Sequence, residues 1–240
     1  MTRRRWIADE YTSDCAALIG PHAAHLARTL RARVGQQFDV ACGDRVYRAT
    51  VSWVSEDRVD FSLGEEVKAS SGGVPIALLL AIIKFDRMEW AIEKCTELNV
   101  TSIVPVVVRR TEKHLAQAAE KRVERWRRIA LEAAQQSRRT APPEIAAPAK
   151  LSEVLGFEAE QKIVLAENAR GITLNEVLRS RDEAKSLALA VGPEGGWADD
   201  ELEAFAQTGW VAASLGETIL RAETAAIAAL AIARAKLTLE

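Results

Sequence analysis

The stretch LALAVGPEGGW, residues 187–197, decides the expected architecture of this chain. An apolar run, Leu187–Val191, leads directly into a Gly-Pro-Glu-Gly-Gly turn, and acidic residues open the helix expected at Asp199–Gln207, where they suit a helix N-terminus. Three glycines within five residues let the backbone bend sharply and approach a ligand without a Cβ in the way. The residues alone leave two interpretations equally open, a ligand-binding loop and a tight structural turn.

On both sides of this stretch, apolar runs and segments of helical periodicity follow one another along the chain. Runs of the kind that parallel sheets bury on both faces occur at Ile76–Ile83, Ile103–Val108 and Ile163–Ala166. Helical spacing of apolar residues is found over residues 88–98, 119–133 and 223–236. Alternating strands and helices predict an α/β domain with a mostly parallel sheet, in which ligands bind at the carboxyl ends of the strands.

The first 72 residues have a different texture, with short strand-like runs separated by turns. Strands are expected at Gln37–Ala41, Val46–Val54 and Arg58–Leu63, after a helix over His22–Val34 that Gly35 would end. The best linker candidate is Ser70-Ser71-Gly72-Gly73, so we expect a small barrel-like domain over residues 1–72 and the α/β domain over residues 73–240. The proline-rich residues 141–149 are expected to form a loop.

Composition excludes several classes of protein. Hydrophobic residues make up 48% of the 240 residues and charged residues 28%, and no apolar run reaches the roughly 18 residues needed to span a bilayer. Asp9 and Glu10 stand where a signal peptide would need apolar residues, so a cytoplasmic protein without a membrane partner is expected. The cysteines form no C-x-x-C pair and the histidines no cluster, so no metal site is expected.

The charge is distributed unevenly along the chain. Residues 1–140 hold 23 Lys and Arg against 18 Asp and Glu, whereas residues 141–240 hold 9 against 16. A basic front half suits a protein that presents one face to a polyanion, although charge alone favours the simpler interpretation of a solvated helix face.

Three further motifs carry candidate chemistry. Residues 215–225, LGETILRAETA, place Arg221, Glu223 and Thr224 at the start of an apolar helix. An arginine there is costly unless it faces a site or has a partner, and Glu223 is one possible partner. The other motifs are KFDRME at residues 84–89 and QQSRR at residues 135–139, each of which alone is weak.

Together, and in this order, these motifs resemble the SPOUT class of methyltransferases. Within that class the chain is similar to the family that methylates N3 of a uridine in 16S ribosomal RNA of the small ribosomal subunit. The resemblance covers nearly the whole chain and includes His25-Leu26, Leu30-Arg31 and Gly35 of the first domain, K-x-D-R-M-E, Gln-Gln-Ser-x-Arg, GPEGG and LGxxILRxETA.

The resemblance implies a small PUA-like β-barrel that binds RNA, followed by an α/β SPOUT domain with a C-terminal trefoil knot. It further implies a homodimer and S-adenosylmethionine as cofactor, held largely by main-chain groups. The implied cofactor-binding residues are Leu165, Gly192, Pro193, Glu194, Gly195, Gly196, Ser214, Leu215, Gly216, Ile219, Leu220 and Thr224.

Methylation of N3 requires loss of the N3 proton, and the resulting charge is shared by the flanking carbonyl oxygens. A guanidinium suits that charge, so Arg221 or Arg139 is the expected catalytic arginine, and Glu223 or Glu194 the expected proton acceptor. The residues expected to contact RNA are Arg3, Arg4, Arg5, His25, Arg31, Lys84, Arg87, Arg122, Arg125, Arg128 and Arg138.

Three other functions compete with this one. One is a methyltransferase of the same fold that acts on transfer RNA or on another base atom. Another is a non-catalytic RNA-binding or ribosome-assembly factor, which an eroded GPEGG or a missing Arg221 would favour, and both motifs are intact. The last is a nucleotide-dependent oxidoreductase, which the absence of G-x-G-x-x-G after an early strand disfavours.

Overall fold

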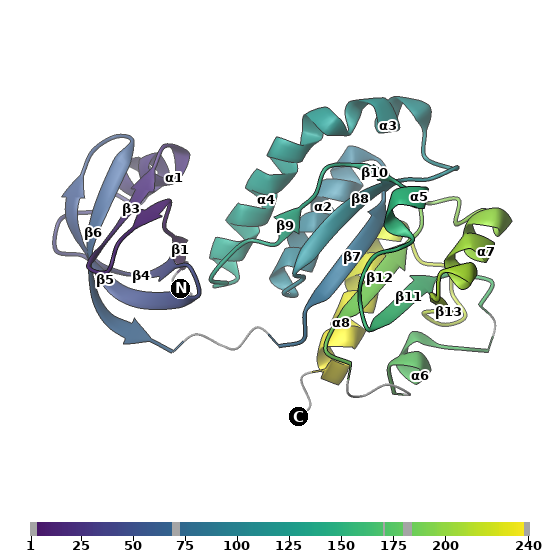
Figure 1. Ribbon diagram of the computed structural model, residues 1–240. Helices are drawn as coiled ribbons and strands as arrows, with labels where there is room; N and C mark the ends of the chain where they lie inside the picture. The colour runs from purple at the N-terminus through teal and green to yellow at the C-terminus, as the bar shows by residue number, and fades with distance from the viewer. Residues whose placement is uncertain (1–3, 69–72, 170, 180–183, 238–240) are drawn as a thin grey trace. The chain divides into compact units, whose positions relative to one another are not determined.

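A computed structural model of the protein describes residues 4–68, 73–169, 171–179 and 184–237 (Figure 1). The chain divides into two compact units. The first combines Met1–Ser71 with Leu131–Pro142, and the second combines Gly72–Ala130 with Pro143–Glu240. The domain boundary expected between residues 72 and 73 adjoins residues 69–72, which lie outside the described ranges, and it stays a prediction.

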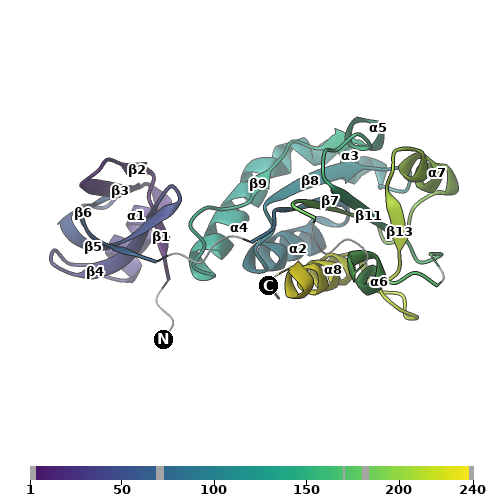
Figure 2. The ribbon, with the colours of Figure 1, turned by 60° about the horizontal axis from the view of Figure 1, so that its bottom comes forward.

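The first unit is built on a six-stranded sheet in the order β1-β4-β5-β6-β3-β2. The edge strands β1 and β2 are neighbours in sequence, and the residues between them bond to both sides: the Ala8 amide donates to the Ala41 carbonyl and the Asp9 amide to the Ala17 carbonyl, both at 2.9 Å. Register shifts between β5 and β6 bend the sheet so that its two edges approach (Figure 2). The strands are β1 (Trp6–Ile7), β2 (Glu10–Tyr11), β3 (Cys15–Ile19), β4 (Gln37–Cys42), β5 (Arg45–Val54) and β6 (Arg58–Val67).

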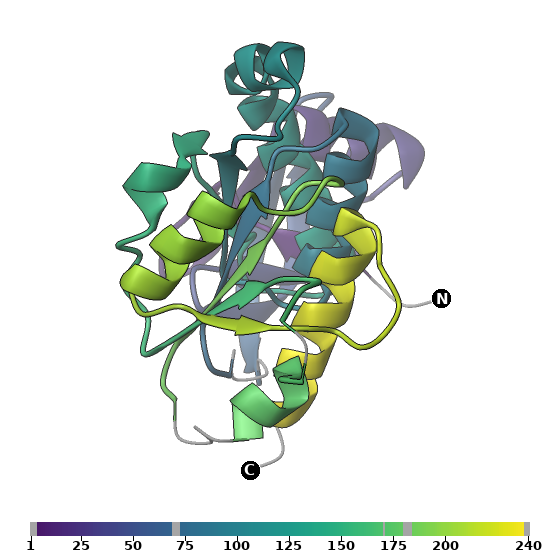
Figure 3. The same cartoon turned by 90° about the vertical axis from the view of Figure 1, so that its right-hand side faces the viewer.

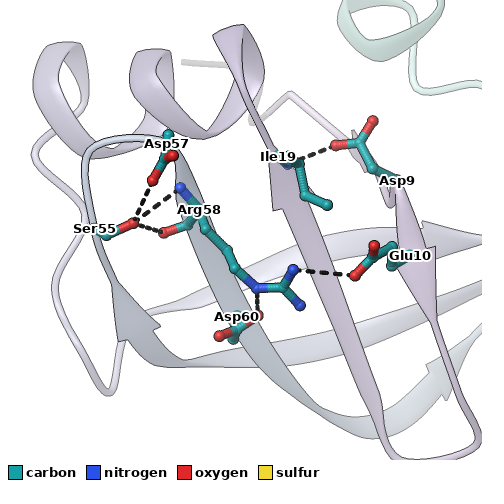
Figure 4. A network of polar contacts seen from close by, with 7 residues as sticks. All are labelled: Asp9, Glu10, Ile19, Ser55, Asp57, Arg58 and Asp60. Atoms are coloured by element: carbon teal, nitrogen blue, oxygen red, sulfur yellow. Dashed lines mark hydrogen bonds and ion pairs between the residues drawn. The ribbon is translucent and has the colours of Figure 1, made fainter.

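Polar contacts at the β2 edge reinforce this closure (Figure 4). Arg58 on β6 donates from Nε to Asp60 at 2.8 Å and from Nη1 to Glu10 on β2 at 3.0 Å, so its guanidinium spans β3, which lies between these strands. The carboxylate of Asp9 accepts from the Ile19 amide at 2.7 Å. Because these side chains are largely exposed, each contact stabilises the fold by little, and its main effect is to fix the position of the edge strand.

The helix predicted over His22–Val34 is wrong in length. The chain forms only α1 (Pro21–Ala24) and a π-helical turn, η1 (His25–Thr29), and Arg31 then adopts a left-handed conformation with φ +52°. Gly35 does not end the helix. Its amide donates to the Val51 carbonyl at 2.8 Å, so the segment is drawn to the edge of β5 instead of continuing helically.

The second unit contains a parallel sheet in the order β10-β8-β7-β12-β11-β13, with β9 paired to β8, which confirms the predicted α/β class. The strand predicted at Leu187–Val191 has the same bounds in the structure. The residues expected to form a loop at 141–149 hold two short strands, which neighbouring prolines limit to two residues each. The strands are β7 (Ile76–Ala81), β8 (Ser102–Val107), β9 (Glu144–Ile145), β10 (Ala149–Lys150), β11 (Gln161–Leu165), β12 (Leu187–Val191) and β13 (Val211–Ala213).

Helices cover both faces of this sheet. Leu78 and Leu80 of β7 share one core with α2 (Phe85–Glu97) and α8 (Ala222–Leu237). Leu79 points the other way and shares a second core with α7 (Asp199–Gln207). Figure 3 shows α7 and α8 on opposite sides of the strands. The long helix predicted over 119–133 begins later, and the remaining helical segments are α3 (Lys113–Ala118), η2 (Glu120–Arg122), α4 (Val123–Gln136), α5 (Leu151–Val154) and α6 (Leu174–Arg179).

None of the helices in the described ranges has both the length and the apolar character that crossing a bilayer requires.

The start of α7 is fixed to the sheet by one buried carboxylate. Glu201, which is 7% exposed, accepts from the Ala198 amide at the helix start and from the Arg109 amide just after β8, both at 2.8 Å. Amides at a helix N-terminus lack partners within the helix, and a carboxylate that satisfies them also suits the helix dipole. Glu201 therefore ties the segment after the glycine-rich turn, which follows β12, to the end of β8, which is separated from β12 by β7.

We predict that Glu201→Gln destabilises the protein by about 1–3 kcal/mol, because the amide NH₂ would face one of the two buried amides and leave it without an acceptor. Thermal unfolding measures the effect. Glu203→Gln, on the exposed side of the same helix, is the matched control and should unfold as the unchanged protein does. Equal melting temperatures for the two variants would contradict the assigned role of Glu201.

Candidate functional site

The second unit has a cavity of about 320 Å³ at the carboxyl ends of β11, β12 and β13. This is the edge of a parallel sheet where ligands bind, and the volume suits a small organic molecule. The lining residues come from the ends of these strands and the segments after them, from the start of α8, and from Arg110 after β8. They are Arg110, Leu165, Ala166, Glu167, Asn168, Val191, Gly192, Pro193, Gly195, Gly196, Trp197, Asp199, Leu202, Ala213, Ser214, Leu215, Gly216, Glu217, Thr218, Ile219, Leu220, Ala222 and Ala225.

Strand register brings the three segments to one place. Leu165, the last residue of β11, pairs with Val191 of β12 on one side and with Ala213 of β13 on the other. Each of these residues ends its strand, so the segments that follow leave the sheet at the same level. The walls of the cavity are therefore set by backbone pairing within the sheet.

Trp197 closes the floor of the cavity. Its indole Nε1 donates to the Leu165 carbonyl at 2.9 Å, and its ring packs edge-on against Phe205 of α7 with 4.8 Å between centroids. A Cβ on Gly192 would lie 3.1 Å from that Nε1 and 3.2 Å from the neighbouring ring carbon. A Cβ at position 192 would therefore force the Trp197 ring to move by a few tenths of an ångström.

Two other glycines are required by backbone conformation. Gly196 has φ +71° and Gly216 has φ +126°, values that residues with a Cβ rarely adopt. Gly195 lies under Arg110, whose guanidinium donates to the Gly195 carbonyl and whose Cδ would be 3.2 Å from an added Cβ. The glycines of the GPEGG motif therefore fit a backbone that packs against Trp197 at Gly192 and against Arg110 at Gly195.

The charges that line the cavity are mostly acidic. Glu167, Asp199 and Glu217 contribute carboxylates, and Arg110 contributes the guanidinium among the lining residues in the described part of the chain. Such a cavity complements a ligand that carries positive charge and has one anionic group. Sequence reasoning missed Arg110, Glu167 and Asn168. The signal for the last two was their place directly after a predicted strand, whereas Arg110 required knowing the sheet order.

The structure gathers most of the residues implied for the cofactor. Those that line the cavity are Leu165, Gly192, Pro193, Gly195, Gly196, Ser214, Leu215, Gly216, Ile219 and Leu220. Glu194 and Thr224 do not line it. Glu194 turns to Arg87, with 3.0 Å between its Oε1 and the Nη1 of Arg87, and Thr224 is exposed on the first turn of α8.

The candidate catalytic residues lie in different environments. Arg221 is exposed between Leu220 and Ala222, which both line the cavity. Its possible ion pair with Glu223 is not formed, because Glu223 is 2% exposed and its Oε1 lies 3.9 Å from the Nε of Arg87. Arg139 belongs to the first unit, so its position relative to the cavity stays a prediction.

Several arginines expected to contact RNA have partners within the second unit. Arg125 donates to both carboxylate oxygens of Glu89, at 2.6 and 2.8 Å. Arg122 lies over the Phe85 ring at 4.7 Å and 3.9 Å from the same carboxylate. Lys84 and Arg128 are exposed, and neither forms an ion pair with a described residue.

The candidates of the first unit surround its N-terminal segment. The guanidinium carbon of Arg4 lies 5.8 Å from the Trp6 ring centroid, and the His25 ring packs against the same indole with 6.1 Å between ring centroids. The Arg5 amide donates to the Gln135 carbonyl at 3.1 Å, and its guanidinium donates to the Arg138 carbonyl. Burial lowers the pKa of Arg5. The other candidates are Arg31, which is exposed, and Arg3, which lies outside the described residues.

Over the described ranges, no group of three or more His, Cys, Asp or Glu side chains is arranged to hold a metal ion.

Comparison with known proteins identifies relatives over most of the chain. The RNA methyltransferase domain family matches residues 71–234. Ribosomal RNA small subunit methyltransferase E of Synechocystis sp. is 31% identical over 236 residues, which cover 96% of this chain and 77% of that protein. A methyltransferase of Legionella pneumophila, solved with its bound cofactor S-adenosylmethionine, is 28% identical with a TM-score of 0.86 over 98% of both chains. Ribosomal RNA small subunit methyltransferase E of Neisseria gonorrhoeae, bound to S-adenosylmethionine, is 28% identical with a TM-score of 0.85 over 95% of both chains.

We predict that Gly192→Ala destabilises the protein by about 1–3 kcal/mol, because its Cβ would push against a tryptophan ring already held by Leu165 and Phe205. The measurement is thermal unfolding. Gly156→Ala is the control, since a Cβ there meets nothing within 4 Å. If Gly192→Ala were as stable as Gly156→Ala, the requirement for glycine beside Trp197 would be refuted.

Proposed function

The chain belongs to the RNA methyltransferase family, among the ribosomal RNA small subunit methyltransferases E, and on this premise we propose that it transfers a methyl group from S-adenosylmethionine to N3 of a specific uridine in 16S ribosomal RNA. The observation that carries the proposal is the cavity at the ends of β11, β12 and β13. It is lined by the glycine-rich turn and the segment before α8, the two motifs that pointed to this chemistry. The names of the relatives indicate which RNA is modified, and the cavity is the candidate binding site for the methyl donor.

The residues present fit S-adenosylmethionine. The donor carries a sulfonium, an ammonium and a carboxylate, so it combines positive charge with one anionic group. Glu167, Asp199 and Glu217 offer carboxylates to the positive groups, and Arg110 offers a guanidinium to the carboxylate. When bound, the donor supplies an activated methyl group. The chain's part is to hold it and to keep the reacting atoms aligned, which is the main source of rate enhancement in such a transfer.

Arg221 is the proposed catalytic arginine. It sits on the segment that borders the cavity, is exposed, and forms no ion pair with a described residue, so its guanidinium is free to meet a base presented from outside. Once N3 loses its proton, negative charge spreads to the flanking carbonyl oxygens of the uracil ring. A guanidinium stabilises that charge with several fixed donors and does not lose its own proton. Arg139 of the first unit remains the alternative.

The carboxylates first expected to accept the N3 proton have another environment. Glu223 is buried and, like Glu194, lies outside the cavity lining. Both instead contact Arg87. Burial and the contact with Arg87 argue against Glu223 as the proton acceptor.

The proposal extends to partners and place of action. Basic side chains of both units would bind RNA phosphates without recognising the base sequence. They are Arg4, Arg5 and Arg31 of the first unit and the exposed Lys84 and Arg128 of the second. The resemblance further supports a trefoil knot in the second unit and a homodimer, and the exposed Trp90 and Ile219 provide apolar surface that a second copy could cover. A ribosomal RNA substrate supports action in the cytoplasm.

Calorimetry with S-adenosylmethionine, followed by mapping of methylated nucleotides in 16S ribosomal RNA, tests this function. We expect binding of the donor and one methyl group on a uridine ring nitrogen. Absence of binding heat would favour a non-catalytic RNA-binding factor. A methyl group on another RNA or another atom would retain the enzyme class and overturn the assigned target.

We predict that Arg221→Ala lowers the methylation rate at least about hundredfold, because a donor aimed at the developing charge is lost. Affinity for S-adenosylmethionine should stay within about threefold, since the side chain does not line the cavity. Single-turnover methylation and calorimetry give the two values. Arg179→Ala removes an exposed arginine of the same unit and should change neither. Parallel loss of rate and affinity in Arg221→Ala would assign Arg221 to donor binding.

A further inference from the structure

Arg87 lies on the first turn of α2 and contacts two segments that border the cavity. Its Nη1 lies 3.0 Å from Oε1 of Glu194, in the glycine-rich turn, and its Nε lies 3.9 Å from Oε1 of Glu223, in the first turn of α8. Arg87 itself does not line the cavity, and its side chain is 28% exposed. One guanidinium thus faces carboxylates from two elements that are separate in sequence.

We infer that Arg87 is a positioning residue that holds the glycine-rich turn and the start of α8 at a fixed spacing, and so keeps the cavity in the shape that binds the methyl donor. The inference rests on the proposed function, because it concerns the same cavity. It differs from the expectation that Arg87 contacts RNA, since the guanidinium is engaged inside the unit.

The buried position of Glu223 makes its contact with Arg87 necessary. The carboxylate is 2% exposed, and its Oε2 has no hydrogen-bond partner among the described residues. A buried charge without compensation is strongly unfavourable. Arg87 and the positive end of α8 supply the compensation, so the start of α8 is drawn toward α2.

The second contact of Arg87, with Glu194, restrains the glycine-rich turn. Glu194 lies between Pro193 and Gly195, which both line the cavity. A contact that fixes the Glu194 side chain therefore also restrains these two lining residues. Ala222, beside Glu223, lines the cavity as well. An arginine offers donors on more than one edge of a rigid plane, whereas a lysine is a single point charge on a flexible stem. The geometry therefore calls for a guanidinium.

A simpler role competes with this inference, namely that Arg87 only neutralises the buried Glu223. The two roles separate when the buried charge is removed. In Arg87→Met, Glu223 is left uncompensated and Glu194 untethered. Adding Glu223→Gln removes the buried charge and should restore stability, but it cannot restore the tether on Glu194.

The test compares Arg87→Met, Glu194→Gln, the double variant Arg87→Met with Glu223→Gln, and Arg28→Met as control, because Arg28 forms an exposed ion pair with Glu56 in the first unit. Thermal unfolding and calorimetry with S-adenosylmethionine are measured for each. Arg87→Met should have a lower melting temperature than the unchanged protein and should bind the donor about tenfold more weakly. Glu194→Gln should reproduce the weaker binding with little change in melting temperature.

The double variant decides between the two roles. We expect its melting temperature to recover while its donor affinity stays about tenfold weak, with a raised KM for the donor and kcat at saturating donor within about threefold. Recovery of both stability and affinity would overturn the inference and leave Arg87 as a neutralising partner. So would donor affinity in Arg87→Met equal to that of Arg28→Met. If the unchanged protein bound no S-adenosylmethionine, the proposed function would fail instead.

Discussion

The hydrogen bond from the Trp197 indole to the Leu165 carbonyl joins the segment after β12 to the end of β11, and the shape of the cavity depends on it. Leu165 already pairs with Val191 and Ala213, so this carbonyl marks the level at which three strands release their following segments. The ring packs against Gly192 so closely that an added Cβ would lie 3.1 Å from the indole Nε1. Backbone register, an aromatic ring and a glycine together create a wall built largely of main chain.

Much of the fold could be predicted because burial on both faces of a parallel sheet leaves a clear signal. The strand Leu187–Val191 and the helix Asp199–Gln207 have the predicted bounds, since each is defined by a local pattern of apolar residues and by its flanking turns. The segment 22–34 could not be predicted this way. Its helical periodicity is overridden when Gly35 bonds to the Val51 carbonyl, and no local pattern reveals that partner.

In the candidate site too, features set by local sequence could be predicted and features set by tertiary contacts could not. Its glycines were identified from sequence because sharp turns and positive φ values demand them locally. Its side chains were harder. Arg110 reaches the cavity from β8, and the partner of Glu223 proved to be Arg87 of α2 rather than Arg221 two positions away. Such pairings depend on sheet order and helix packing, whereas sequence neighbours are the only partners that a motif displays.

The cavity walls come from segments that follow β11, β12 and β13, with Ala222 and Ala225 of α8 completing them. During synthesis the chain emerges in order, so a nascent polypeptide that ends before α8 has the glycine-rich turn but lacks the lining residues Ala222 and Ala225. Leu78 and Leu80 of β7 also depend on α8 for part of their cover. The ligand can therefore not guide the early stages of folding, and its stabilising effect is confined to a chain whose last helix has already docked.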